Sequence, residues 1–111
     1  MKEKILNIIN HYGVSKQLKY FQSEVFELNE AIIQYEMAYG DMCYSGEAMN
    51  NQRQHIAEEI ADVRVMLRQF QDYYDIPTEK IEEIMDYKVN RQLERIKEEK
   101  WDLHSMMLLM K

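Results

Sequence analysis

Four acidic residues stand at two repeated spacings in this sequence and could together bind a divalent cation. Glu24 and Glu27 are three residues apart, and Glu59 and Asp62 repeat that spacing later in the chain. On an α-helix such residues leave the same face about one turn apart. Two packed helices would bring the four carboxylates together, where they repel one another unless cations neutralise them. Mg²⁺, Mn²⁺ and Ca²⁺ are the cations that prefer oxygen ligands of this kind.

Apolar residues beside these acids predict two helices whose acidic edge borders a hydrophobic core. The two apolar stripes are Leu18, Phe21, Val25, Leu28 and Ile32, and Ile56, Ile60, Val63 and Leu67. Their helical period places each acidic pair at the margin of the buried face. We therefore expect a carboxylate-lined metal site between two helices. The alternative is that these acids are ordinary boundary residues, solvated or paired with Lys or Arg.

A basic stripe offers a second kind of chemistry. Lys88, Arg91 and Arg95 follow one another at helical spacing and share a face. Arg and Lys bind phosphate oxygens, so a basic stripe in the same protein as a metal site suits a polyphosphate ligand. The alternative is that the stripe is a solvated surface of a terminal helix.

Other kinds of site are only weakly indicated. Di-iron carboxylate bundles place His three residues after Glu, whereas here His55 precedes Glu58. Cys43 is the only cysteine, which leaves no partner for an internal disulfide and no set of zinc ligands. The sequence has no Gly-rich phosphate loop and no nucleophile elbow.

Composition favours a single all-α domain over residues 1–111. The chain has three Gly and one Pro in 111 residues, too few for a turn-rich β architecture, and its apolar residues recur at helical spacing. The net charge of −6 argues against a general nucleic-acid-binding surface. No apolar run approaches the ~18 residues of a membrane span, and the first residues do not resemble a signal peptide. With one cysteine, these features predict a cytoplasmic protein that binds neither nucleic acid nor membrane.

Turn-forming residues divide the chain into a predicted four- to five-helix bundle. Gly13 is expected to close the first helix, and Ser15 and Thr78 are expected to cap the second and the fourth. Turn formers without periodic apolar partners predict a loop over residues 40–54. The predicted helices cover residues 2–12, 16–39, about 52–74, and 78 onward.

The end of the chain is unusually apolar. The tail, residues 100–111, contains Trp101, Leu103 and a run of Met and Leu. A domain this small is not expected to cover such a surface alone, so we expect the tail to take part in subunit packing. The predicted assembly is a homodimer or a homotetramer.

Taken together, the motifs resemble those of the MazG-like nucleoside triphosphate pyrophosphohydrolases, in the all-α NTP pyrophosphatase superfamily. The resemblance rests on three motifs and spans about residues 15–96, with HIAEEIADVRVMLRQF as its most specific part. The motifs are Gln17-x6-Glu24-x2-Glu27, Glu59-x2-Asp62 and Lys88-x2-Arg91-x3-Arg95.

The resemblance implies an oligomeric helical hydrolase that uses Mg²⁺, or Mn²⁺ in its place. Such an enzyme cuts (d)NTPs at the α–β phosphate linkage and releases (d)NMP and pyrophosphate. Glu24 and Glu27 would be catalytic carboxylates, with Glu27 the candidate base. The implied metal ligands are Glu24, Glu27, Glu59 and Asp62, and the implied substrate contacts are Gln17, Lys88, Arg91 and Arg95.

Two features depart from the family pattern. Ser23 stands where the family has the first Glu of a Glu-Glu pair, so one acidic group is absent. The predicted 40–54 loop also makes the spacer between the two acidic pairs long. The alternative function is therefore a non-enzymatic helical interaction or regulatory protein with a degenerate metal site.

Overall fold

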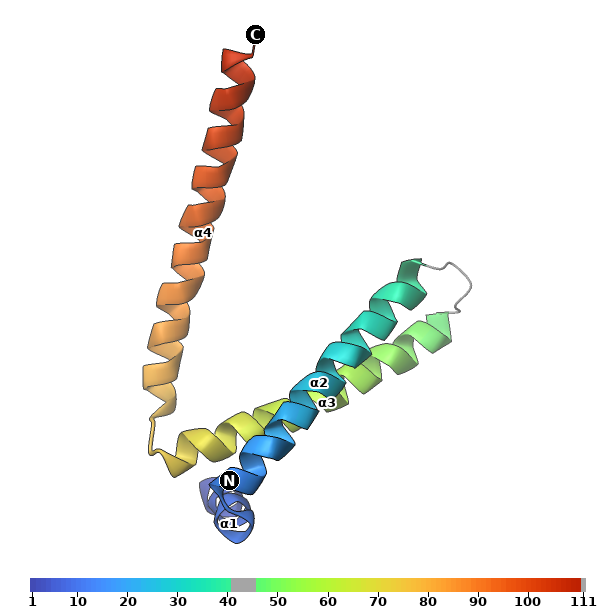
Figure 1. The fold of residues 1–111 in the computed structure, drawn as a ribbon, viewed down its shortest axis with the longest axis vertical. Helices are drawn as coiled ribbons and strands as arrows, with labels where there is room; N and C mark the ends of the chain where they lie inside the picture. Colours follow the sequence, from blue (N-terminus) through green and yellow to red (C-terminus); the bar gives the residue numbers. More distant parts are fainter. Residues whose placement is uncertain (41–45, 111) are drawn as a thin grey trace. The chain divides into compact units, whose positions relative to one another are not determined.

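The computed structural model describes residues 1–40 and 46–110, and all regular structure within these ranges is α-helical. The all-α prediction is therefore confirmed for the described residues. The chain divides into two compact units, Met1–Asp75 and Ile76–Lys111. The single domain and the four- to five-helix bundle stay predictions. The helices are α1 (Lys2–Tyr12), α2 (Val14–Gly40), α3 (Gly46–Tyr73) and α4 (Thr78–Leu109) (Figure 1).

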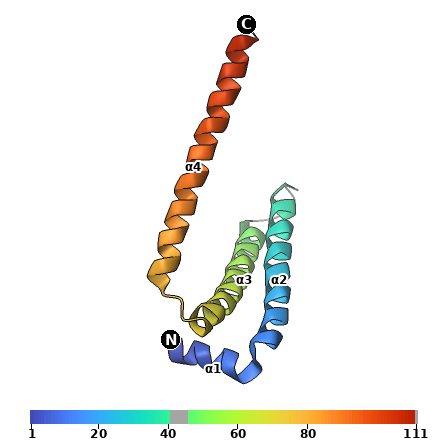
Figure 2. The same ribbon diagram turned by 60° about the vertical axis from the view of Figure 1, so that its left-hand side comes forward.

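In the first unit, α2 and α3 lie side by side, and α1 packs against both of them at one end (Figure 2). Ile5 and Ile9 of α1 are buried there because their i, i+4 spacing puts them on one face of a short helix. Phe21 and Phe70 meet edge to face between α2 and α3, with ring centroids 5.7 Å apart. This contact is one of those that join α2 to α3.

Gly13 ends α1 as predicted. It has a φ of +89°, which is strained for residues with a Cβ, and its N–H donates to the Ile9 carbonyl at 2.8 Å. The second helix then begins at Val14 rather than after a cap at Ser15. A one-residue break thus turns the chain from α1 into α2.

The predicted 40–54 loop is wrong for its second half. Residues 46–54 are helical, so α3 begins at Gly46 and not near Gln52. The side chains of Arg53 and Asn50 hydrogen-bond to each other one turn apart, and Met49 is half-buried. Local contacts of this kind override the weak helix propensities of Gly and Asn, on which the loop prediction rested. Gly40 is the last residue of α2, and the remaining loop positions, 41–45 with Cys43, lie outside the described residues.

Pro77 follows a break between the third and fourth helices, where the sequence predicts that the third helix ends near residue 74. The helix α3 ends at Tyr73, and Asp75 adopts a positive φ of 53°. Pro77 itself is the N-cap of α4, so Thr78 is the first helical residue and not the cap. An extended proline can fill this position because its carbonyl accepts the N–H of Lys80 at 3.1 Å.

The second unit is one continuous helix. The apolar tail predicted after Lys100 continues α4 as far as Leu109, and no residue of α4 is buried. None of the described helices is both long enough and apolar enough to cross a membrane.

An ion pair within α3 joins two successive turns near the end of that helix. The Nε of Arg68 donates to both carboxylate oxygens of Asp72, at 2.9 and 3.0 Å. The Asp72 side chain is only 4% exposed, whereas that of Arg68 is 35% exposed. Asp72 therefore depends on Arg68 for its hydrogen bonds, because water reaches it poorly.

Arg68→Met is expected to destabilise the protein by about 1–2 kcal/mol, because it leaves the Asp72 carboxylate buried without its donor. The exposure of Arg68 keeps this value below that of a fully buried pair. The measurement is the urea midpoint of the full chain. Arg64→Met, at an exposed position one turn earlier, is the matched control and should change the midpoint little. Equal midpoints for the two variants would contradict the prediction.

Candidate metal centre

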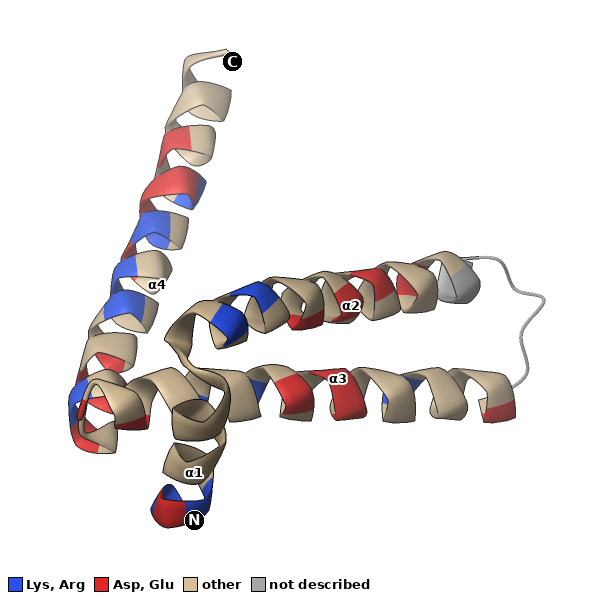
Figure 3. Cartoon of the chain, turned by 60° about the horizontal axis from the view of Figure 1, so that its bottom comes forward, with Lys and Arg blue, Asp and Glu red and all other residues tan. Residues whose placement is uncertain are grey.

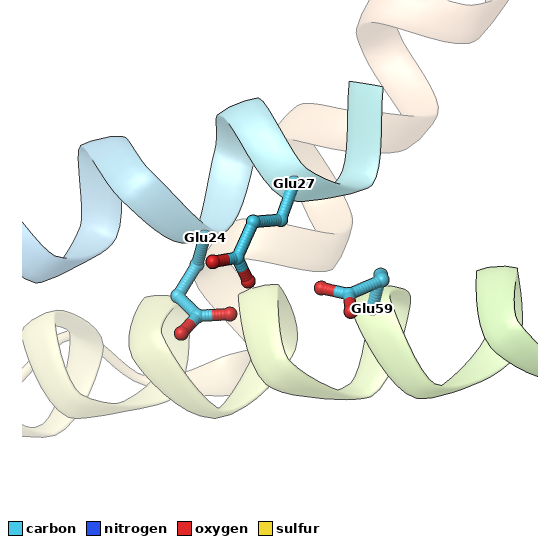
Figure 4. Close-up of side chains that lie close together, drawn as sticks. All are labelled: Glu24, Glu27 and Glu59. Atoms are coloured by element: carbon cyan, nitrogen blue, oxygen red, sulfur yellow. The ribbon is translucent and has the colours of Figure 1, made fainter. Parts of the chain in front are cut away.

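Three of the four predicted acids meet between α2 and α3. Glu24 and Glu27 extend from α2 toward α3, and Glu59 extends from α3 toward them (Figure 4). One carboxylate oxygen of each lies within 4.8 Å of those of the other two. The i, i+3 spacing on α2 and the register of the helix pair together produce this arrangement. Figure 3 shows acidic segments, in red, on both α2 and α3.

Two oxygens of this cluster lack the partners that buried oxygens require. Glu59 is 9% exposed, and its Oε2 is buried without a hydrogen-bond donor. The Oε2 of half-buried Glu24 is in the same condition. Exposed acidic clusters are common and need no ion, but a buried acceptor without a donor destabilises the fold. A cation between the helices would satisfy both oxygens.

Glu24 experiences the crowding of the carboxylates most strongly. Its pKa is raised above the ordinary 4.5, mainly by burial and then by the charges of Glu27, Asp62 and Glu59. A side-chain hydrogen bond with Glu27 raises it further. Each of these causes disfavours the charged form. A bound cation would act in the opposite direction, because it favours the carboxylate.

Asp62 lies at the margin of this cluster. It is exposed and is not one of the three residues whose oxygens converge. Its charge nevertheless contributes to the raised pKa of Glu24, so it is electrostatically part of the site. The structure therefore brings together three of the predicted ligands and places the fourth nearby, and the metal itself stays a prediction.

Gln17, predicted to contact substrate, is a buried residue of the helix interface. It is 5% exposed, and its Nε2 donates to Oε1 of Gln69 at 2.8 Å. The Gln69 amide in turn lies 3.5 Å from the sulfur of Met66. This pairing commits the Gln17 amide to the α2–α3 interface. A substrate contact would require the pair to open, and that role stays a prediction.

The predicted basic stripe lies on α4, in the second unit. Lys88, Arg91 and Arg95 are exposed, and Figure 3 shows the basic segments along the middle of this helix. The guanidinium of Arg91 lies over the Tyr87 ring, 5.8 Å from its centroid, and Arg95 donates to Gln92 at 3.1 Å. The stripe and the carboxylates belong to different units, and a site shared between them stays a prediction.

Two further polar residues of α3 precede Glu59: Gln52, which sequence reasoning missed, and His55, which it considered only as a di-iron ligand. The Oε1 of Gln52 is buried without a partner, and Gln52 precedes Glu59 by two helical turns on the same face. The Nδ1 of His55 lies 3.9 Å from Oε1 of Glu59 and 3.9 Å from Oε2 of Glu58. The seven-residue spacing from Gln52 to Glu59 was a usable signal, but the predicted loop concealed it.

The residues present fit a hard divalent cation. All three converging groups are carboxylates, and they provide neither thiolate nor imidazole ligands. The two buried oxygens without donors are the independent observation that a cation would explain. The site thus belongs to the class of carboxylate clusters set between two antiparallel helices. No known protein family, curated protein or solved structure matches the chain. The resemblance to MazG-like enzymes is therefore carried by the motifs alone.

Proposed function

We propose that this chain is a Mg²⁺-dependent nucleoside triphosphate pyrophosphohydrolase that converts (d)NTPs to (d)NMP and pyrophosphate. The observation that supports the proposal best is the convergence of Glu24, Glu27 and Glu59 within 4.8 Å. Two of these residues carry buried oxygens without donors, as expected of ligands prepared for a cation. The motif resemblance supplies the substrate class.

In the proposed enzyme, Glu24 and Glu59 hold the metal from opposite helices, and Asp62 adds negative charge at the margin. When bound, Mg²⁺ would neutralise phosphate oxygens and lower the pKa of a coordinated water. Glu24 and Glu59 are the more buried carboxylates. They fit the role of metal ligands because an unpaired carboxylate destabilises the fold more when it is buried than when it is exposed.

Glu27 is the proposed general base. It is the most exposed of the three converging carboxylates, so water and substrate reach it. It would accept a proton from the water whose oxygen forms a bond to the α-phosphorus. The bond from that phosphorus to the bridging oxygen breaks, and the bond's electron pair leaves with pyrophosphate.

Lys88 and Arg91 are proposed to hold the charge of the leaving pyrophosphate, with Arg95 beside them. Their exposed cationic groups can donate several hydrogen bonds to phosphate oxygens. Because these residues lie on α4, the proposal requires α4 of this chain or of another copy to lie beside the carboxylates in the substrate complex.

A panel of canonical and modified (d)NTPs, incubated with the protein and Mg²⁺, tests the proposal. At least one substrate should yield equal amounts of the monophosphate and pyrophosphate, and chelation of the metal should abolish both products. Release of orthophosphate instead would place cleavage at another linkage. No product from any substrate, with metal bound by the protein, would reject the enzymatic function.

The second candidate is a non-enzymatic interaction protein, and exposed apolar side chains favour it. Leu18, Val25 and Ile32 recur every seven residues on α2 and are 49%, 41% and 41% exposed. Such a stripe is typical of a surface that another helix covers. Under this alternative, substitution of Glu59 and Asp62 together by Ala leaves partner binding intact. Under the enzymatic proposal, it removes metal binding and turnover together.

A further inference from the structure

The second half of α4 carries an apolar stripe with the spacing of a coiled coil. The intervals along it alternate between four and three residues over three repeats. This alternation is the heptad pattern in which the a and d positions face a partner helix. The positions are Val89, Leu93, Ile96, Lys100, Leu103 and Met107, with Met110 following at the end of the helix.

The helix α4 does not cover these side chains itself. Ile96 is the least exposed of the apolar members at 45%, and Met110 is the most exposed at 84%. The 32-residue helix α4 has no buried residue. It therefore lacks the tertiary packing from which helices in proteins gain most of their stability. A partner helix on this stripe would provide the burial that α4 lacks.

Charges beside the stripe indicate what the partner is. Lys100 is the one polar residue of the stripe and occupies an a position, where a single Lys can fix register. Glu99 occupies the neighbouring g position. In a parallel pair of identical helices in register, Lys100 faces Lys100 of the other helix. Glu99 of each helix flanks Lys100 of the other and offsets this repulsion, and two-fold symmetry forms the Glu99–Lys100 pair twice. The helix is therefore complementary in charge to a second copy of itself.

The antiparallel arrangement is less favourable. With the stripes overlapped as far as possible, it places Lys97 opposite Lys97 and Glu99 opposite Glu99 of the other helix. Like charges that face each other across a seam repel. It also leaves part of the stripe without a partner, whereas the parallel pair covers residues 89–110 completely.

We propose that residues 89–110 of α4 form a parallel, in-register, two-stranded coiled coil with the same segment of a second copy of this chain. In this register, Lys88 and Arg95 occupy c positions and Arg91 an f position, on the outer face. Assembly therefore leaves the basic stripe free. The inference does not depend on the metal centre, so it is tested in the presence of a chelator.

Cysteine cross-linking tests the geometry. In full-length protein with Cys43→Ser, Leu103→Cys places one thiol at a d position, and an in-register parallel pair brings it next to its own copy. Mild oxidation should give a covalent dimer. Leu109→Cys, at an exposed c position of the same helix, is the matched control and should remain mostly monomeric on denaturing gels. Equal cross-linking of the two variants, or none, would overturn the proposal.

Sedimentation equilibrium tests the energetics. Leu103→Glu should dissociate the dimer, whereas Leu109→Glu should not, and circular dichroism shows whether each variant keeps its helices. Lys100→Leu should tighten the dimer by about tenfold or more, since it replaces a charge in the seam with an apolar side chain. A monomeric wild-type chain at high micromolar concentration would overturn the proposal. So would a dimer unaffected by Leu103→Glu.

Discussion

Glu59→Gln is expected to lower the rate of pyrophosphate release from the preferred (d)NTP by about a hundredfold or more. The substitution keeps the size of the side chain and removes one negative charge from the most buried of the three converging carboxylates. A neutral amide oxygen is a weaker ligand for Mg²⁺ than a carboxylate. Loss of rate should therefore accompany loss of metal affinity, and steady-state kinetics over a range of Mg²⁺ concentrations would measure both.

Glu58→Gln is the matched control, because it makes the same chemical change at the preceding residue. The Glu58 side chain is 61% exposed and makes surface contacts with His55 and Gln54. Its substitution should change the rate by less than about threefold. If Glu58→Gln and Glu59→Gln reduce the rate equally, the cause is the loss of one negative charge from α3 and not the loss of a ligand from the carboxylate cluster. If neither has an effect, the proposed metal centre is wrong.

The local signals in the sequence were strong enough to predict the elements that carry the candidate site. Gly13 and Pro77 act through their own backbones, so the ends of the elements beside them could be foreseen. The pairing of Glu24 with Glu27, and the meeting of both with Glu59, followed from helical period. The prediction that the apolar stripe of α2 faces a buried core was wrong for Leu18, Val25 and Ile32, which are 49%, 41% and 41% exposed.

What the sequence did not reveal depended on the register between helices. The hydrogen bond from Gln17 to Gln69 joins residues 52 positions apart, and no local pattern specifies such a pair. Likewise, the separation of Asp62 from the three converging carboxylates depends on how α2 and α3 rotate against each other. Residues 46–51 were wrongly predicted as loop because the prediction rested on the low helix propensities of single Gly and Asn residues. Helix formation is cooperative over the whole segment.

Glu24→Gln is expected to reverse its effect on stability when Mg²⁺ is added. In chelator at pH 7, the variant should be more stable than the wild type, because burial and the neighbouring carboxylates raise the pKa of Glu24 and so disfavour its charged form. With Mg²⁺ at about a hundred times its dissociation constant, the wild type should gain about 2.7 kcal/mol. The variant should gain much less, because it lacks one of the carboxylates proposed to hold the cation.

The pH dependence in chelator follows from the raised pKa of Glu24. Such a carboxyl has a higher pKa in the folded state than in the unfolded state. It stabilises the fold at pH values below its unfolded-state pKa, and this stabilisation is lost as the pH rises through its folded-state pKa. The advantage of Glu24→Gln should therefore be small near pH 4 and should grow toward pH 7. Urea unfolding at several pH values, with Glu30→Gln on the exposed face of α2 as the control, measures it. A wild type that is the more stable protein in chelator at pH 7 would contradict the electrostatic account. A wild type that gains nothing from Mg²⁺ or Mn²⁺ would contradict metal binding by the cluster.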